Sequence, residues 1–147
     1  VLVAIGGLSA SLGAADITQI EFISTSFDKS DGGTLSARVR FNEPVVVSTS
    51  GGTPTLAVTN GNQGSGSGRG PHALAYASGT GTNELVFSLA IGAANAATNL
   101  GDILVIGANS LALNSGTIKD VATSTTNATI THSSAIGTAA GSITVAA

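Results

Sequence analysis

Two histidines and many serines are the residues of this chain that could support nucleophilic catalysis. His72 follows Pro71 beside a Gly- and Ser-rich stretch, and His132 ends a Thr-rich segment. A serine hydrolase holds a serine, a histidine and a carboxylate in contact, and one large class carries the serine in a Gly-x-Ser-x-Gly turn. Neither histidine has a carboxylate beside it in sequence, and the run from Gly64 to Gly68 matches neither that turn nor Gly-x-Gly-x-x-Gly. We therefore expect two surface histidines without a catalytic role, and no enzyme.

Carboxylates offer a second kind of chemistry, the binding of a hard cation. Asp28 and Asp31 lie three residues apart in a turn that ends in two glycines, and Glu43 follows the next expected strand. Calcium is bound by several carboxylate and carbonyl oxygens together, so these three residues are the candidate calcium ligands. The alternative, which the sequence favours, is that Asp28 and Asp31 only accept hydrogen bonds from their own turn. No other cofactor is expected.

The charge balance limits the possible partners. Five Lys and Arg against eight Asp and Glu give a formal net charge of −3, so the chain lacks the basic surface that nucleic-acid binding requires. It has no cysteine, which excludes disulfides, thiolate metal sites and cysteine nucleophiles. Arg38 and Arg40 share the polar face of an expected strand, with Glu21 or Glu84 across from them. Arg69, in the Gly-rich stretch, is the candidate for contact with a receptor or glycan, unless it serves only solubility.

Strands must position these residues, because strand patterns dominate the sequence. Between Thr34 and Phe41 apolar residues alternate with polar ones, which is the period of a strand with one buried face. Pro44 ends this strand, since proline has no N–H to donate to a central strand. A second strand starts at Val45, and a Gly-Gly-Thr-Pro turn leads to a third at Thr55.

Further short apolar segments follow, separated by turns rich in Gly, Asn, Ser and Thr. They cover residues 16–26, 71–78, 84–91, 102–106, 111–113, 127–132 and 143–145, and residues 92–100 could hold one helical turn. About eight short strands with regular turn signals are typical of an all-β sandwich. The charged fraction of 9% is well below the usual value of about 25%, which is typical of a scaffold. We predict one domain, an antiparallel β-sandwich over residues 16–147.

Residues 1–15 form an apolar arm without charged side chains. The arm is similar to the apolar region of a secretion signal, with residues 13–15 as the cleavage site, although no basic residues precede it. It is too short, and too interrupted by two glycines, to span a bilayer. We expect it to be buried either against a neighbouring subunit or larger assembly, for example as an added strand, or against its own sandwich. The interface candidates are Val1, Leu2, Val3, Ile5, Leu8 and Leu12.

Four motifs occur in order along the chain. They are Phe41-Asn42-Glu43-Pro44-Val45, Gly52-Thr53-Pro54-Thr55-Leu56, the run Ser-Gly-Thr-Gly-Thr-Asn-Glu-Leu-Val-Phe at 78–87, and Leu-Ala-Leu-Asn-Ser-Gly-Thr-Ile-Lys-Asp at 111–120. Together they resemble the bacterial immunoglobulin-like, cadherin-like repeats of giant surface adhesins, which also appear in phage virion proteins. The resemblance covers residues 17–130. It implies an immunoglobulin-like β-sandwich with a structural or adhesive role.

The chain departs from those adhesins in two respects. It carries one copy without an internal period, and it lacks the acidic positions between repeats that often bind calcium in the family. A single module with an apolar arm favours a virion surface component, such as a capsid decoration or fibre-associated protein, that self-associates or binds other assembly proteins. The alternative is an adhesion module of a secreted or cell-surface adhesin, with calcium as a stabilising ion. A carbohydrate-binding or hydrolytic domain is disfavoured, because only Tyr76 and four Phe could stack on sugars.

Overall fold

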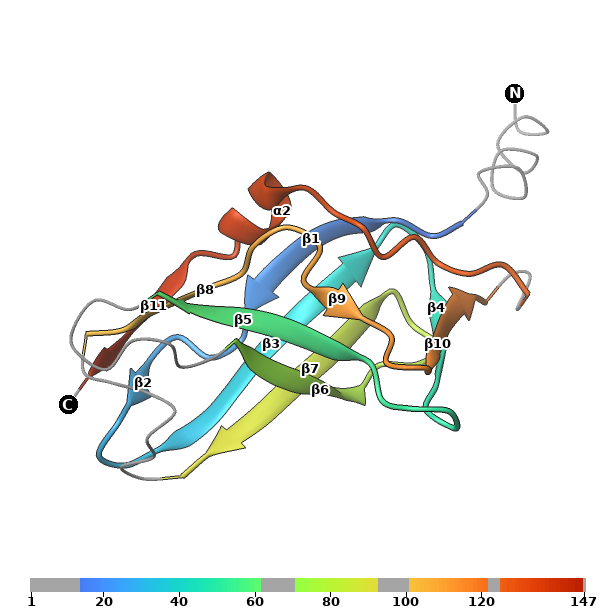
Figure 1. The fold of residues 1–147 in the computed structure, drawn as a ribbon. Helices are drawn as coiled ribbons and strands as arrows, with labels where there is room; N and C mark the ends of the chain where they lie inside the picture. The colour runs from blue at the N-terminus through green and yellow to red at the C-terminus, as the bar shows by residue number, and fades with distance from the viewer. Residues whose placement is uncertain (1–13, 62–70, 93–100, 122–124, 147) are drawn as a thin grey trace.

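The computed structural model describes residues 14–61, 71–92, 101–121 and 125–146, which are mostly β-strands (Figure 1). The strands are β1 (Ile17–Phe22), β2 (Phe27–Asp28), β3 (Gly33–Phe41), β4 (Val45–Ser48), β5 (Thr55–Gly61), β6 (His72–Ser78), β7 (Glu84–Ile91), β8 (Ile103–Val105), β9 (Leu111–Ala112), β10 (Thr117–Asp120) and β11 (Ser142–Ala146). A short helix, α2 (Ser134–Thr138), precedes β11. Within these ranges no helix has the length and hydrophobicity needed to cross a membrane.

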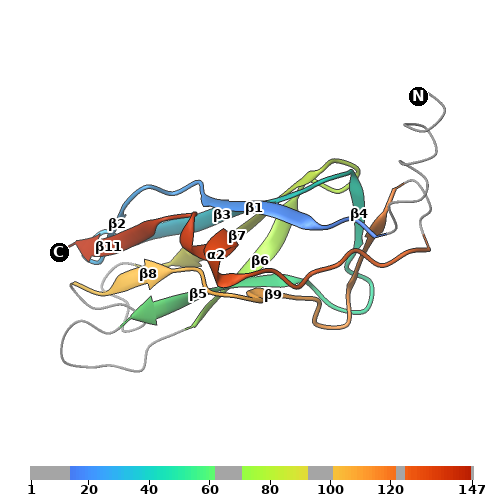
Figure 2. The same ribbon diagram turned by 90° about the horizontal axis from the view of Figure 1, so that it is seen from above.

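Nine strands form one sheet in the order β1-β3-β7-β6-β5-β8-β11-β2, with β9 also beside β5, and β4 and β10 form a separate ribbon. Of the strand pairs in the described ranges, only β11 and β2 run parallel. The prediction of an all-β, mostly antiparallel fold is therefore confirmed. The two layers visible in Figure 2 belong to one sheet, however, because β6 pairs with both β7 and β5. The main sheet is thus a curled half-barrel rather than a clear sandwich of two sheets.

The core lies inside this curl and follows the predicted alternation. Leu35, Ala37, Val39 and Phe41 of β3 are buried, while the residues between them are less buried or exposed. On the neighbouring strand β7, Phe87 pairs with Ala37 and is fully buried. Its ring meets the ring of Tyr76 from β6 edge to face, with centroids 6.0 Å apart. Burial of these large side chains stabilises the fold by roughly 1.5–3 kcal/mol each.

The segment after β10 differs from the expectation. Residues 127–132 were expected to form a strand, but they contribute only isolated bridges, at Asn127 and Thr129. The chain then forms α2, whose N-terminus is capped by the Ser133 hydroxyl through a 3.4 Å hydrogen bond from the N–H of Ile136. Gly137 is the buried residue of this helix, and a Cβ there would collide with the carbonyl oxygens of Ile106 and Gly107, which follow β8. This close approach between backbones fixes the helix, and it leaves no periodic signal in the sequence.

Three expectations lie outside the described residues. They concern the arm residues Val1, Leu2, Val3, Ile5, Leu8 and Leu12, the loop position Arg69, and the possible helical turn at 93–100. These stay predictions.

Candidate functional site

Ser110 and His132 form the contact that most resembles catalytic machinery. The Ser110 hydroxyl lies 2.8 Å from Nε2 of His132, and the Ser110 backbone N–H donates a 2.9 Å hydrogen bond to the same nitrogen. On the other side of the ring, Nδ1 lies 3.0 Å from the carbonyl oxygen of Ser133. A ring nitrogen that accepts an N–H carries no proton. The neutral imidazole therefore keeps its proton on Nδ1 and donates it to that carbonyl.

The surroundings of this pair favour a structural role. Ser110 and His132 are each only 7% exposed. The imidazole Nδ1 faces a carbonyl oxygen where a hydrolytic triad would present a carboxylate. The backbone N–H of His132 also donates a 3.0 Å hydrogen bond to Oδ1 of Asn109. The histidine thus joins the turn before β9 to the segment that enters α2, and the prediction that it lies at the surface was wrong.

His72 belongs to a second buried polar cluster, where β5 ends and β6 begins. It is 5% exposed, and its Nε2 lies 3.2 Å from Nδ2 of Asn60. Burial lowers the pKa of His72 below its ordinary value of 6.5, and the nearby charge of Asp102 opposes this effect without cancelling it. A neutral imidazole at this position can accept a hydrogen bond from the Asn60 amide. His72 was also expected at the surface, and its burial corrects that expectation.

Asp28 uses its carboxylate within its own turn. The backbone N–H and the hydroxyl of Ser30 donate hydrogen bonds of 2.8 and 2.6 Å to Oδ1 of Asp28. These two bonds, the hydroxyl first, lower the pKa of Asp28, since both stabilise its charged form. The turn is closed by the N–H of Gly32, which donates a 2.9 Å hydrogen bond to the Asp28 carbonyl. This is the arrangement that the sequence favoured over a metal site.

Glu43 does not join Asp28 and Asp31. Its pKa is raised first by partial desolvation and then by the negative charges of Asp120 and Asp16, so these are its acidic neighbours. In the part of the chain that the structure describes, no three His, Cys, Asp or Glu side chains lie together as a metal ion would require. Asp28 and Asp31 precede β3 and Glu43 follows it, so the length of this nine-residue strand separates the aspartates from Glu43. Calcium binding by these residues stays a prediction, and the hydrogen bonds within the turn favour its alternative.

A buried carboxylate anchors the start of β1. Oδ1 of Asp120 accepts a 2.7 Å hydrogen bond from the backbone N–H of Ala15. The carbonyl of Ala15 accepts a 2.7 Å hydrogen bond from the N–H of Thr129, and the N–H of Asp16 donates one of 2.9 Å to the side chain of Asn42. The chain is thus held firmly where β1 begins. A separation of 105 residues gave no local signal for this contact.

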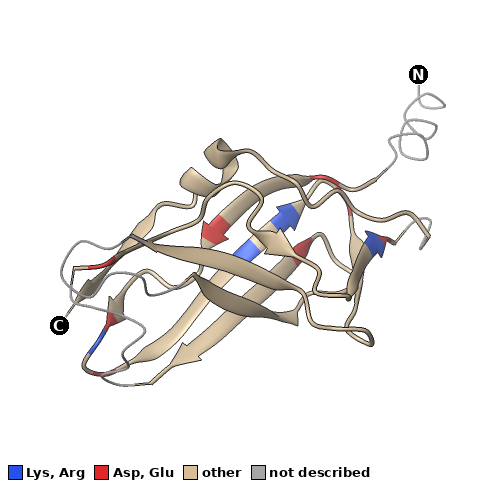
Figure 3. Cartoon of the chain, viewed as in Figure 1, with Lys and Arg blue, Asp and Glu red and all other residues tan. Residues whose placement is uncertain are grey.

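The arginines of β3 pair across strands, as expected. Nε and Nη2 of Arg40 both donate to Oε2 of Glu84 on β7, the first at 2.7 Å. Arg38 lies between two acids, with its Nε 3.2 Å from Oε1 of Glu21 and its Nη1 3.7 Å from Oε1 of Glu84. Figure 3 places these charges side by side on β1, β3 and β7. Opposite charges alternate in this group, so it offers no excess charge to an ionic ligand.

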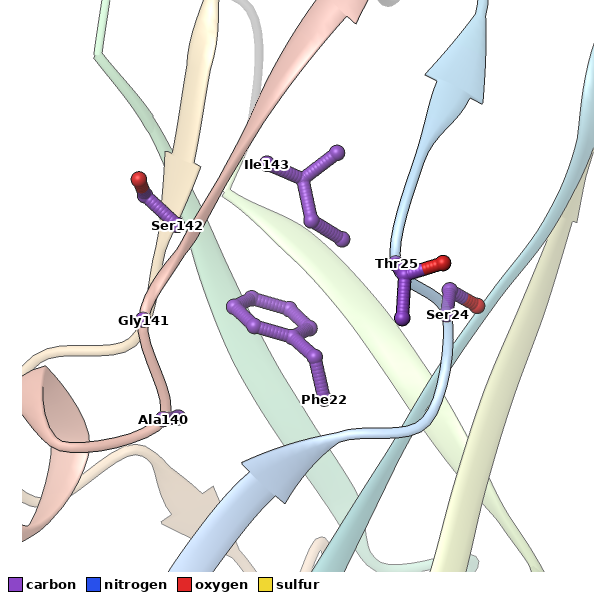
Figure 4. Close-up of a pocket in the computed structure, with 7 residues that line it drawn as sticks. All are labelled: Phe22, Ser24, Thr25, Ala140, Gly141, Ser142 and Ile143. Atoms are coloured by element: carbon purple, nitrogen blue, oxygen red, sulfur yellow. The ribbon is translucent and has the colours of Figure 1, made fainter.

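Two small cavities flank the link between α2 and β11. One, of about 190 Å³, is lined by Phe22, Ser24, Thr25 and residues 140–143 (Figure 4). The other, of about 370 Å³, is lined by Val105, Ile106, Gly107, Thr138, Gly141 and Ser142. Neither contains an ionisable side chain among these lining residues.

Comparison with known proteins gives no match: no protein-family model, curated protein or solved structure is significantly similar to this chain.

Proposed function

We propose that this domain is a non-enzymatic structural module of a surface assembly, and that the assembly is a phage virion. In this proposal the domain is a capsid decoration or fibre-associated component that contacts further copies of itself or other virion proteins. The proposal extends the resemblance to immunoglobulin-like repeats, with the curled sheet as a variant of their β-sandwich.

The placement of the two ends of the described chain carries this proposal. β1 begins at the end of the molecule that holds β4 and β10, whereas β11 finishes at the opposite end beside β2 (Figures 1 and 2). Hydrogen bonds hold both ends, from Ala15 to Asp120 at one and from the N–H of Lys29 to the carbonyl of Ala146 at the other. A module held at opposite ends can transmit load along its length and space out its neighbours.

The use of the polar side chains supports the same proposal. His132, Asp28 and Asp120 each accept hydrogen bonds from backbone N–H groups of the domain itself. Groups committed in this way stabilise the fold and are not available to a substrate. The structural reading therefore explains these residues without a reaction.

A direct test uses a tandem protein in which residue 146 of one copy is joined to residue 14 of the next. Small-angle scattering should give a maximum dimension about twice that of one copy, because residues 14 and 146 lie at opposite ends of the domain. A compact pair, little longer than one copy, would contradict an in-line structural module.

A separate experiment tests where the protein is found. An antibody against the domain should label virus particles in immuno-electron microscopy.

The second candidate is an adhesion module in a secreted or cell-surface adhesin. The same placement of the ends favours it, since adhesin repeats follow one another in line. Antibody labelling of intact bacterial cells, with unlabelled particles, would select this candidate over the virion.

A further inference from the structure

The main sheet is open between its first and last long strands. β1 pairs with β3 on one side, and residues 142–144 of β11 pair with β8 on one side; on their other sides, the described residues place no strand. Because α2 packs beside β1, the opening is left beside Phe22 and residues 142–144 of β11. The 190 Å³ cavity lies in this opening, between Phe22 at the end of β1 and Ile143 of β11. In Figure 4 the side chains of Phe22, Ile143 and Thr25 surround the opening, and that of Ser142 points away.

The chemistry of this opening fits an apolar side chain on an extended backbone. Phe22, Ala140 and Ile143 supply an apolar lining, Ser24 and Thr25 form a polar rim, and the neighbouring Ile23 is 40% exposed. The volume is below the roughly 300–1,000 Å³ of small-molecule pockets, so the cavity suits a side chain better than a free ligand. The free edge of residues 142–144 of β11 offers backbone groups for pairing, and the cavity beside it, with its mixed polar and apolar lining, can take a side chain of an added β-strand.

The chain contains a segment of matching chemistry. Residues 1–5, Val-Leu-Val-Ala-Ile, carry no charged side chain and place Val1, Val3 and Ile5 on one face of an extended strand. Five extended residues measure roughly 17 Å, which is long enough to pair with residues 142–144 of β11. Their burial would contribute roughly 1.5–3 kcal/mol for each large side chain.

The path of the chain points to a neighbouring molecule as the source of this strand. The described chain enters at the end that holds β10, where Ala15 is fixed to Asp120 and Thr129. Asp16 is bridged to Thr129, and α2 packs beside β1, so residues 127–138 lie along the route from Ala15 to the opening of the same molecule. The arm of a molecule stacked end to end would instead approach the opening from the opposite end, which holds β2 (Figure 1).

We infer that residues 1–5 of a second copy add as a strand to the opening between β1 and β11 and insert Val3 or Ile5 into the cavity. The contact is head to tail, so it is heterologous and generates rows or rings of copies. This inference rests on the proposed structural role and names the surface through which copies associate.

Site-directed disulfide formation in the full chain tests the inference, since the chain has no cysteine of its own. Mixing Ile5→Cys and Thr25→Cys proteins under mild oxidation should give a disulfide-linked heterodimer at least ten times faster than mixing Ile5→Cys with Thr53→Cys. Thr25 and Thr53 are both exposed, which makes them a matched pair. Equal rates for the two mixtures would overturn the inference. So would a disulfide within single, dilute molecules that carry both Ile5→Cys and Thr25→Cys, or preferential linkage of Thr25→Cys to itself.

Sedimentation velocity provides the second measurement. The wild-type chain should show a mass that rises with concentration. The Val3→Asp/Ile5→Asp variant should need at least a tenfold higher concentration to associate, and the Ser9→Asp/Ser11→Asp variant, with the same added charge in the arm, should behave as wild type. Equal melting temperatures would show that all three proteins are folded. A wild-type chain that stays monomeric would overturn the arm contact alone, because the scattering test of the tandem protein does not depend on it.

Discussion

The backbone N–H of Ala15 donates a 2.7 Å hydrogen bond to Oδ1 of Asp120, and the two residues are 105 positions apart. Through this bond the first strand of the main sheet is joined to the ribbon of β4 and β10. The carboxyl group of Asp120 is buried, with 2% of the residue exposed, and Glu43 is an acidic neighbour. The contact explains why a carboxylate is retained at this buried position.

Removing this carboxylate should destabilise the domain. We expect Asp120→Ala to lower the free energy of unfolding by about 1.5–3 kcal/mol, because it leaves the N–H of Ala15 without its charged acceptor. Asp120→Asn keeps an acceptor oxygen and removes the repulsion with Glu43, so its effect should be smaller. Urea unfolding of both variants measures the difference, with Asp31→Ala as the exposed control. Equal losses for Asp120→Ala and Asp31→Ala would show that the bond contributes nothing.

Gly52 allows the turn after β4 to pack against the backbone that leads into β10. A Cβ at Gly52 would collide with the carbonyl oxygen of Asn114. We expect Gly52→Ala to cost about 1–3 kcal/mol, as overpacking does elsewhere. Gly107→Ala, where a Cβ meets no atom within 4 Å, should change stability by less than about 0.5 kcal/mol. Thermal unfolding of the two variants makes the comparison, and similar melting temperatures would contradict the packing argument.

The burial of His72 predicts a loss of stability in mild acid. Its pKa is lowered in the folded domain, so below the ordinary value of 6.5 the unfolded chain takes up a proton that the folded domain resists. Stability should therefore be complete above that pH and should fall as the pH drops below it towards the lowered pKa. His72→Gln should flatten this part of the profile, measured by urea unfolding between about pH 7.5 and about pH 5.5. If the unfolding free energy of His72→Gln depends on pH as steeply as that of the wild type, titrating groups other than His72 cause the loss of stability.

The contact between Ser110 and His132 should not act as a hydrolytic pair. We expect no labelling of the native protein by a fluorophosphonate probe, because Ser110 is buried and Nδ1 of His132 faces the Ser133 carbonyl where a triad would present a carboxylate. Ser110→Ala should instead cost about 1 kcal/mol of stability through its lost hydroxyl. Labelling that disappears in Ser110→Ala would refute the structural role.

Calcium should not stabilise the domain through the β2 turn. Oδ1 of Asp28 already accepts two hydrogen bonds from Ser30, and Glu43 has other acidic neighbours. We therefore expect millimolar calcium to leave the melting temperature unchanged relative to magnesium. A calcium-specific rise that is lost in Asp28→Ala would restore the turn as a metal site. If the rise in melting temperature is lost only in Glu43→Gln, the calcium site lies near Asp120 instead of in the β2 turn.

The sequence sufficed for those features that depend on local periodicity. The alternation in residues 34–41 predicted the buried face of β3, since side chains of a strand point to opposite sides in turn. The pairing of Arg40 with Glu84 was also foreseeable, because both lie on the polar faces of alternating strands. Even the turn at Asp28 followed from residues that are neighbours in the chain.

Tertiary structure alone decided what depends on residues far apart in the sequence. The bond from Ala15 to Asp120 and the burial of both histidines follow from how the strands pair and curl. Periodicity specifies which side of a strand is buried, but not its neighbour in the sheet. For that reason the all-β class could be predicted from the residues, whereas the half-barrel, its opening beside Phe22 and the contacts within it could not.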